Sequence, residues 1–167
     1  MTTIESAPIT PDELAEMPDN NRFELVDGQL LQRDMGAVSS WVAGEVHRQI
    51  ATFGQHERQL GWAFPADCGY QCFPDSPNTL RKPDVSFIRR GRLPGEALPE
   101  GYIRIAPDLV VEVVSRHDAY EDVDEKLEMF FRAGVELVWI INPKSRTIHL
   151  LRREPGVLAE LKASGSP

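Results

Sequence analysis

Hydrophobic and polar residues alternate along the chain in short blocks, and the spacing within each block indicates a helix or a strand. Residues 10–13, Thr-Pro-Asp-Glu, are typical of a helix start, with Thr10 as the N-cap and proline in the first turn. This helix is expected to end before Pro18. Residues 23–26 and 29–32 then flank an Asp-Gly pair, which predicts a β-hairpin.

The middle of the chain predicts one long helix followed by strands. The helix is expected to begin at Ser39 or Ser40 and to end at Gly54, because apolar residues recur there every three or four positions. Residues 62–73 predict one or two strands. Residues 85–88 predict another, which follows a proline.

The clearest pattern lies in the C-terminal half. Residues 109–114, Leu-Val-Val-Glu-Val-Val, predict a strand buried on both faces. An amphipathic helix follows, and then strands at residues 137–141 and 147–151. Strand, helix and strand in this order predict a parallel pair, whereas the early hairpin is antiparallel. The chain is therefore predicted to be an α/β (α+β) protein with a mixed central β-sheet flanked by helices.

The composition is that of a globular protein. The chain has 167 residues, 41% of them hydrophobic, which predicts one domain over residues 10–151 with terminal extensions at 1–9 and 152–167. The longest apolar stretch, residues 137–141, is too short for a membrane span, and residues 1–9 do not form a secretory signal. Cys68 and Cys72 are expected to be buried thiols in a reducing compartment, so a cytoplasmic protein is expected.

Two acidic residues occupy positions that predict burial. Glu112 lies inside the β-branched run, and Asp84 opens the strand at residues 85–88. A buried carboxylate is costly unless a metal ion or a cationic side chain compensates its charge. Two such carboxylates on neighbouring strands would form a site of hard oxygen ligands for Mg²⁺ or Mn²⁺. Zinc is not expected, because no histidines and cysteines have the spacing of zinc ligands.

Lys126 lies beside the apolar stripe of the predicted helix. Its ammonium group could therefore reach the sheet, but Asp122 lies four residues before it. Such an acid–base pair is common on a solvated helix face. The spacing alone favours this surface pair over a role in a site.

Several short motifs occur in a fixed order: residues 23–28 (Phe-Glu-Leu-Val-Asp-Gly), 81–88 (Arg-Lys-Pro-Asp-Val-Ser-Phe-Ile), 107–115 (Pro-Asp-Leu-Val-Val-Glu-Val-Val-Ser) and 138–140 (Val-Trp-Ile). In these motifs the chain resembles the Uma-two (Uma2) family of restriction endonuclease-like proteins, within the PD-(D/E)XK nuclease superfamily. The resemblance covers residues 10–151. It implies a restriction endonuclease-like fold and an Mg²⁺-dependent endonuclease that hydrolyses phosphodiester bonds in DNA.

The resemblance also implies roles for individual residues. Asp84 and Glu112 match the two metal-binding acids, and Glu24 matches an acid of the opening hairpin that completes the catalytic set. Val114 stands where the superfamily has a lysine, and Lys126 is the expected substitute. By analogy with nucleases of this fold, a homodimer is expected.

Departures from the family pattern leave an alternative open, a nuclease-fold interaction module without catalytic activity. Arg116-His117 stands where the family has Pro-Ser, and residues 159–167 do not resemble its final strand. A glycosidase-type carboxylate pair fits the acids but leaves Lys126 without a role. His47 is interpreted as a structural histidine and Asp108 as a strand-entry residue.

The charge distribution bears on the DNA partner. The net charge of −8 argues against general attraction to nucleic acid. Residues 81–92, however, carry five basic residues against one acid, whereas residues 108–128 carry eight acids against two bases. A basic rim beside the metal-binding acids would contact phosphates, although solvated surfaces would show the same pattern. The residues assigned to nucleic-acid binding are Arg81, Lys82, Arg89 and Arg90.

Overall fold

A mixed β-sheet forms the centre of the protein. The structure, a computed structural model, describes residues 8–33, 35–115, 120–154 and 157–163. β5 and β6 are parallel, and the other neighbouring pairs are antiparallel, so the mixed sheet is as predicted. Among the described residues, six strands pair in the order β3 (Gly61–Pro65), β4 (Val85–Arg89), β5 (Leu109–Val113), β6 (Leu137–Asn142), β7 (Thr147–Glu154) and β8 (Val157–Ala163).

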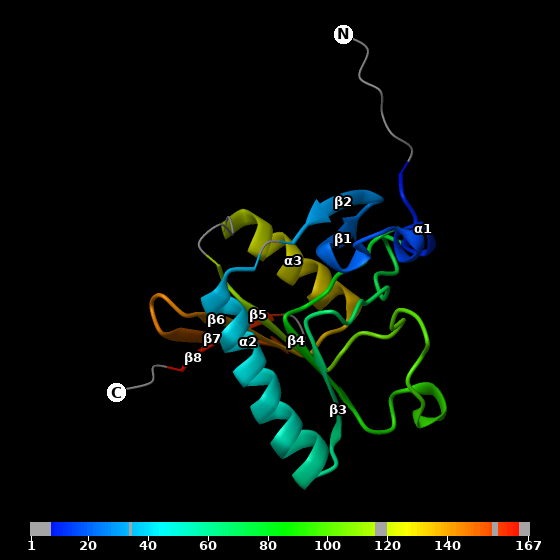
Figure 1. Ribbon diagram of the computed structural model, residues 1–167. Helices are drawn as coiled ribbons and strands as arrows, with labels where there is room; N and C mark the ends of the chain where they lie inside the picture. The colour runs from blue at the N-terminus through cyan, green and yellow to red at the C-terminus, as the bar shows by residue number, and fades with distance from the viewer. Residues whose placement is uncertain (1–7, 34, 116–119, 155–156, 164–167) are drawn as a thin grey trace.

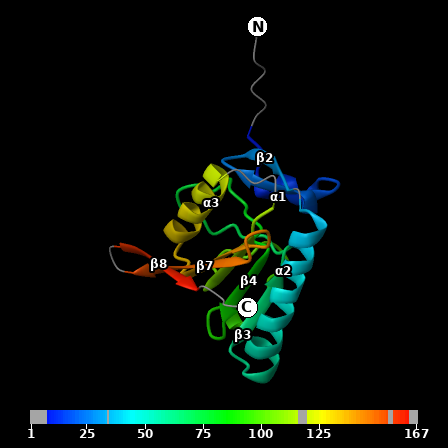
Figure 2. The same cartoon turned by 90° about the vertical axis from the view of Figure 1, so that its left-hand side faces the viewer.

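Two long helices cover opposite faces of this sheet (Figures 1 and 2). They are α2 (Ala37–Ile50) and α3 (Tyr120–Ala133). Side chains alternate between the faces of a strand. Val111 and Val113 of β5 pack in the cluster that contains Ala43 of α2, and Val110 packs with Leu127 of α3. Glu112 lies between Val111 and Val113 in the strand, so its side chain points to the opposite face, which α3 covers.

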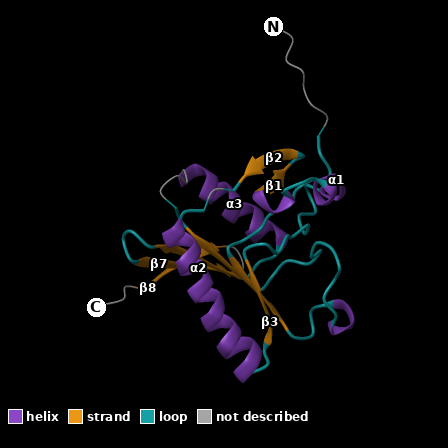
Figure 3. Ribbon diagram, in the orientation of Figure 1, coloured by secondary structure: helices purple, strands orange, loops and turns teal. Residues whose placement is uncertain are grey.

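The N-terminal segment forms a hairpin beside the sheet (Figure 3). α1 (Pro11–Glu16) begins with the predicted cap, in which the Thr10 hydroxyl accepts a hydrogen bond from the Glu13 amide. β1 (Phe23–Val26) and β2 (Gln29–Gln32) pair across the predicted Asp-Gly turn. The backbones of Leu25 and Leu80 exchange two hydrogen bonds of 2.9 Å. This pairing holds the hairpin against the segment that leads into β4.

Three predicted element boundaries differ in the structure. α2 begins at Ala37 with Gly36 as its N-cap, because Ser39 is buried and its hydroxyl donates a hydrogen bond to the Val114 carbonyl. The helix also does not end at Gly54 but continues as a π-helix over Ala51–Glu57. Of the residues predicted as strand at 62–73, those after β3 contribute only isolated bridges, at Tyr70.

Although residues 159–167 do not resemble the family's final strand in sequence, the tail contributes a strand to the sheet. β7 runs past the expected domain boundary at Leu151, and β8 pairs with it along its whole length. A long strand such as β7 would otherwise present an unpaired edge, and this pairing covers it. The apolar pattern of the tail does not predict this strand, because the pairing with β7 is made by backbone hydrogen bonds rather than by apolar side chains.

Cys68 and Cys72 are free, half-buried thiols, and burial raises their pKa to about 11 and about 12. No helix within the described part of the chain is long and apolar enough to cross a bilayer.

Candidate functional site

Four charged side chains from four separate segments meet between the hairpin, the sheet and α3. Glu24 lies on β1, Asp84 directly before β4, Glu112 on β5 and Lys126 on α3. The Lys126 ammonium nitrogen lies 3.0 Å from both carboxylate oxygens of Glu112 and 3.1 Å from Oε1 of Glu24. We refer to these four residues as the acid–lysine cluster.

Strand register brings Asp84 to Glu112. Val85 pairs with Val111 in the antiparallel β4–β5 ladder, so the residue before Val85 lies beside the residue after Val111. The Asp84 carboxylate accepts a hydrogen bond of 2.7 Å from the Val113 amide, which fixes its position against β5. The two acids therefore lie on neighbouring strands, which is the condition on which the expected metal site depended.

Lys126 differs from what its spacing alone favours. The structure places its ammonium group with Glu112 and Glu24, whereas Asp122 is exposed on the helix. Only 16% of the Lys126 side chain is exposed. Lys126 thus lies with the acids, as the resemblance implies, rather than in the surface pair that spacing alone favours, because Leu127 and Phe130 anchor α3 on the sheet and turn Lys126 toward the carboxylates.

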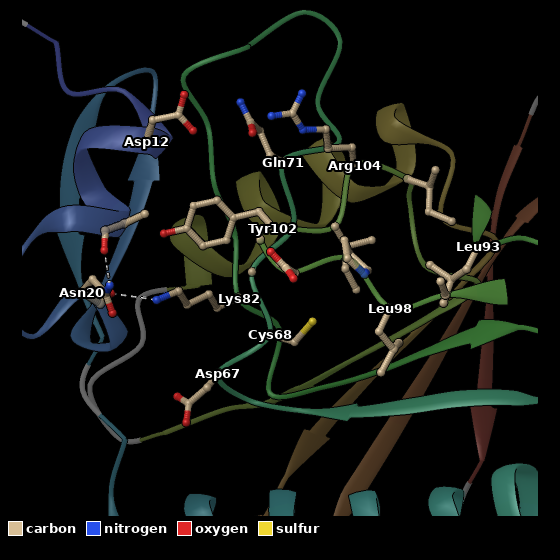
Figure 4. Close-up of a pocket in the computed structure, with 18 of the residues that line it drawn as sticks. Asp12, Asn20, Asp67, Cys68, Gln71, Lys82, Leu93, Leu98, Tyr102 and Arg104 are labelled. Carbon is tan, nitrogen blue, oxygen red and sulfur yellow. Dashed lines mark hydrogen bonds between the residues drawn. The ribbon is translucent and has the colours of Figure 1, made fainter. Parts of the chain in front are cut away.

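Arg81 and Lys82 do not form the predicted basic rim. Both are buried, with 3% of each residue exposed. Arg81 Nη1 lies 3.1 Å from Glu24 Oε2, and the Lys82 amide donates to Glu24 Oε1. The Lys82 ammonium group points away from the cluster, donates to the Asn20 carbonyl and borders a pocket of about 880 Å³ (Figure 4). The Arg81 guanidinium and the Lys82 backbone amide therefore hold Glu24 in position.

Arg33 is a site residue that the sequence did not indicate. Its guanidinium lies 3.6 Å from Asp84 Oδ1 and 3.7 Å from Glu24 Oε1, and it donates to the Ala66 carbonyl. It follows β2 directly, so the hairpin supplies both Glu24 and this cation. The predicted hairpin is the sequence feature that places Arg33, next to the end of β2, on the same side of the molecule as Glu24.

The acids of the cluster differ in their electrostatics. Burial alone would raise the pKa of the Glu24 carboxyl. The positive charges of Lys126, Arg81 and Arg33 outweigh burial and hold that pKa below its usual value. Burial raises the pKa of Asp84 despite the nearby cations, and it raises the pKa of Glu112 to about 8. Glu24 is thus a fixed anion, whereas burial disfavours the charged forms of Asp84 and Glu112.

Lys126 remains charged in this environment. Burial would lower the pKa of its ammonium group, but the charges of Glu112, Glu24 and Asp84 raise the pKa above its usual value. The cluster therefore contains a permanent cation in contact with two carboxylates.

Asp84 and Glu112 fit a magnesium-type ion. Glu112 Oε1 is buried and lies 3.0 Å from the Lys126 ammonium nitrogen, but no described residue donates a hydrogen bond of good geometry to it, so this oxygen still has a lone pair for a further ligand. Mg²⁺ is commonly held by one or two carboxylates, with water and substrate phosphate as the other ligands. Within the described ranges, no three or more His, Cys, Asp or Glu side chains are grouped to hold a metal. Asp84 and Glu112 would therefore offer such an ion two protein carboxylates.

Stability without metal is expected to fall as the pH rises from about 4.5 to about 8. Glu112 titrates at its ordinary value near 4.5 when unfolded but at about 8 when folded, so its neutral form favours the folded state. That contribution is complete below pH 4.5 and is lost above pH 8, on the order of a few kcal/mol. Glu112→Gln should flatten this dependence in thermal melts with EDTA, whereas the exposed control Glu125→Gln should keep it. Equal pH profiles for wild type and Glu112→Gln would contradict the assignment.

The other sequence candidates lie away from the cluster. His47 is half-buried on α2, and His117 falls outside the described residues. Arg89 is the last residue of β4 and lies five residues after Asp84. At ~3.3 Å per residue along a strand, the two residues are about 16 Å apart. Arg90 follows it. Asp108 is buried and binds Arg89 and Arg92, which gives this strand-entry residue a structural role.

Comparisons with known proteins agree with this architecture. A family model named Uma2, described as "Putative restriction endonuclease", matches residues 11–166. The crystal structure of a "putative nuclease belonging to DUF820" from Anabaena variabilis ATCC 29413 superposes with a TM-score of 0.74 at 22% identity, over 96% of this chain and 90% of that chain. At this identity the likeness shows the fold alone, and it confirms the predicted mixed α/β architecture. No curated protein matches.

Proposed function

The chain belongs to the Uma2 family, and from this membership we propose that it is a metal-dependent endonuclease that hydrolyses phosphodiester bonds in DNA. The observation that carries the proposal is the convergence of Asp84, Glu112 and Lys126 from three segments on one point. Two buried carboxylates beside a charged lysine are groups suited to metal-assisted phosphate hydrolysis.

Asp84 and Glu112 are the proposed ligands of Mg²⁺ or Mn²⁺, which when bound supplies a more acidic water and positive charge at the phosphate. Lys126 is proposed to donate hydrogen bonds to the reacting phosphate or to the attacking water. Its ammonium group is charged and is already held at the carboxylates. A fixed donor of this kind stabilises the negative charge that builds up in the transition state.

Glu24 is proposed to act through Lys126 as a positioning residue. It is held from the other side by Arg81 and by the Lys82 amide, so its carboxylate cannot turn away from the lysine. The rigid Glu24–Lys126 contact of 3.1 Å fixes where the ammonium group points.

DNA cleavage tests the proposal. The wild-type protein is expected to cleave at least one of three DNA forms with Mg²⁺, namely supercoiled plasmid, linear duplex or single strand, and to lose this activity in EDTA. An inert protein on all three forms with Mg²⁺ and with Mn²⁺ would contradict it. Cleavage of both strands at one site with second-order dependence on protein would support the homodimer expected by analogy.

One observation favours an interaction module without catalysis as a second candidate. Three cations, Lys126, Arg33 and Arg81, surround the three acids, so their formal charges balance without a metal. Calorimetric titration with Mn²⁺ separates the candidates. The endonuclease is expected to show saturable binding that Glu112→Gln abolishes, and a module is expected to show none.

A further inference from the structure

A concave surface of about 1080 Å³ lies at the end of the sheet away from the acid–lysine cluster. It is bordered by the end of β4, the starts of β5 and β6, and β7 near its C-terminal end. We call it the arginine groove, after the four arginines that line it. They are Arg89, Arg90, Arg152 and Arg153.

The groove is separate from the proposed cleavage site. Arg89 and Asp84 stand at opposite ends of β4, about 16 Å apart along the strand at ~3.3 Å per residue. In the antiparallel ladder, the β5 end nearest the groove carries Asp108, whereas Glu112 lies near the other end. A ligand in the groove therefore does not touch the acid–lysine cluster.

Positive charge exceeds negative charge in the groove. The acids there are Asp108, which binds Arg89 and the nearby Arg92, and Glu136, which lies 3.5 Å from Arg89. Arg90, Arg152 and Arg153 have no ion pair with any residue that the structure describes, and all three are exposed. The surplus stands out in a chain whose net charge is −8.

Arg89 is also held in position. Asp108 is buried, accepts from the Arg89 amide at 2.8 Å and pairs with its guanidinium, so the buried acid aligns a half-exposed cation. A pre-positioned guanidinium loses little conformational entropy on binding a phosphate, which it can grip through two parallel hydrogen bonds. The remaining wall is apolar and includes Phe87 and Leu137, a surface on which a sugar or base can pack.

We propose that the arginine groove is a second binding site, which takes phosphate groups of nucleic acid or of a free nucleotide. Several like charges in one concavity repel one another, and phosphate oxygens relieve this repulsion. If the proposed function holds, the phosphates are those of the DNA substrate. One strand spaces its phosphates about 3.4 Å apart along the duplex axis, so groove and cleavage site would be roughly five nucleotides apart.

Salt-dependent binding tests the proposal. The double variant Arg90→Gln/Arg152→Gln removes two exposed charges, and Arg48→Gln, which removes an exposed arginine on α2 that pairs with Glu45, is the control. Binding of a labelled 20-base-pair duplex is measured by fluorescence anisotropy across NaCl concentrations in EDTA. Thermal stabilisation by ATP without metal is measured in parallel.

The two arms distinguish the sources of phosphate. A DNA backbone in the groove predicts that the double variant binds about tenfold more weakly and that its salt slope falls by about 2, with Arg48→Gln unchanged. A free nucleotide predicts loss of stabilisation by ATP with unchanged DNA binding. If the double variant matches wild type in both arms, the groove binds no phosphate and the proposal is wrong. Asp84→Ala should leave DNA binding in EDTA and stabilisation by ATP unchanged. The cleavage proposal can therefore fail without affecting the test of the groove.

Discussion

Asp84→Ala is expected to reduce Mg²⁺-dependent DNA cleavage at least about 100-fold, the scale seen when one charge-stabilising group is removed from an active site. The carboxylate is one of the two proposed metal ligands, and alanine offers no oxygen in its place. The measurement is the single-turnover cleavage rate at saturating Mg²⁺, compared with Asp124→Ala as a control. Asp124 is an exposed acid on α3 that lies outside the cluster.

This variant must remain folded for the rate to be informative. Asp84→Ala leaves the Val113 amide without its hydrogen-bond acceptor, which is expected to cost about 1–3 kcal/mol. Thermal melting measures that loss, and assays are run below the melting transition. If folded Asp84→Ala cleaves within a fewfold of wild type, Asp84 is not a metal ligand of the reaction.

Glu24→Gln is expected to destabilise the fold by about 3–5 kcal/mol, the range found when one partner of a buried ion pair is removed. The side-chain amide of the introduced glutamine still accepts a hydrogen bond from the Lys82 backbone. The buried Arg81, however, loses its anionic partner, and Lys126 loses one of its two carboxylate partners. Urea denaturation at pH 7 measures the change.

A second substitution tests whether the loss of stability in Glu24→Gln comes from the unpaired Arg81 charge. Arg81→Met added to Glu24→Gln removes the uncompensated guanidinium, and it should restore part of the lost stability. A loss under 1 kcal/mol for Glu24→Gln, or additive losses in the double variant, would show that Glu24 is not a buried electrostatic partner of Arg81.

The placement of Asp84 and Glu112 at or beside buried strands was predictable because strand patterns are local, whereas the pairing of the two strands is a long-range contact that the patterns leave open. The buried run around Glu112 and the strand after Asp84 are visible in the sequence, and burial of an acid requires a partner. The surroundings of Glu24 were not predictable in the same way. Arg81 and Lys82 read as a surface rim because a run of charges does not reveal that a hairpin distant in sequence covers it.

The other misses share this cause. Arg33 reaches Asp84 only because the hairpin folds over the sheet, and β8 forms because β7 offers a free edge. Lys126 was ambiguous by spacing, since a helix position beside the apolar stripe can face either solvent or the sheet. In each case long-range contacts, rather than local preference, decide the outcome.

The most direct test of the central claim measures cation binding and DNA cleavage over the same range of Mg²⁺ concentration. Wild type is expected to cleave with a rate that saturates over the concentrations at which calorimetry shows binding, and Glu112→Gln is expected to lose both. Cleavage by Glu112→Gln at the wild-type rate, or saturable binding by wild type without cleavage of any DNA form, would contradict the claim that this cluster is a metal-dependent cleavage site.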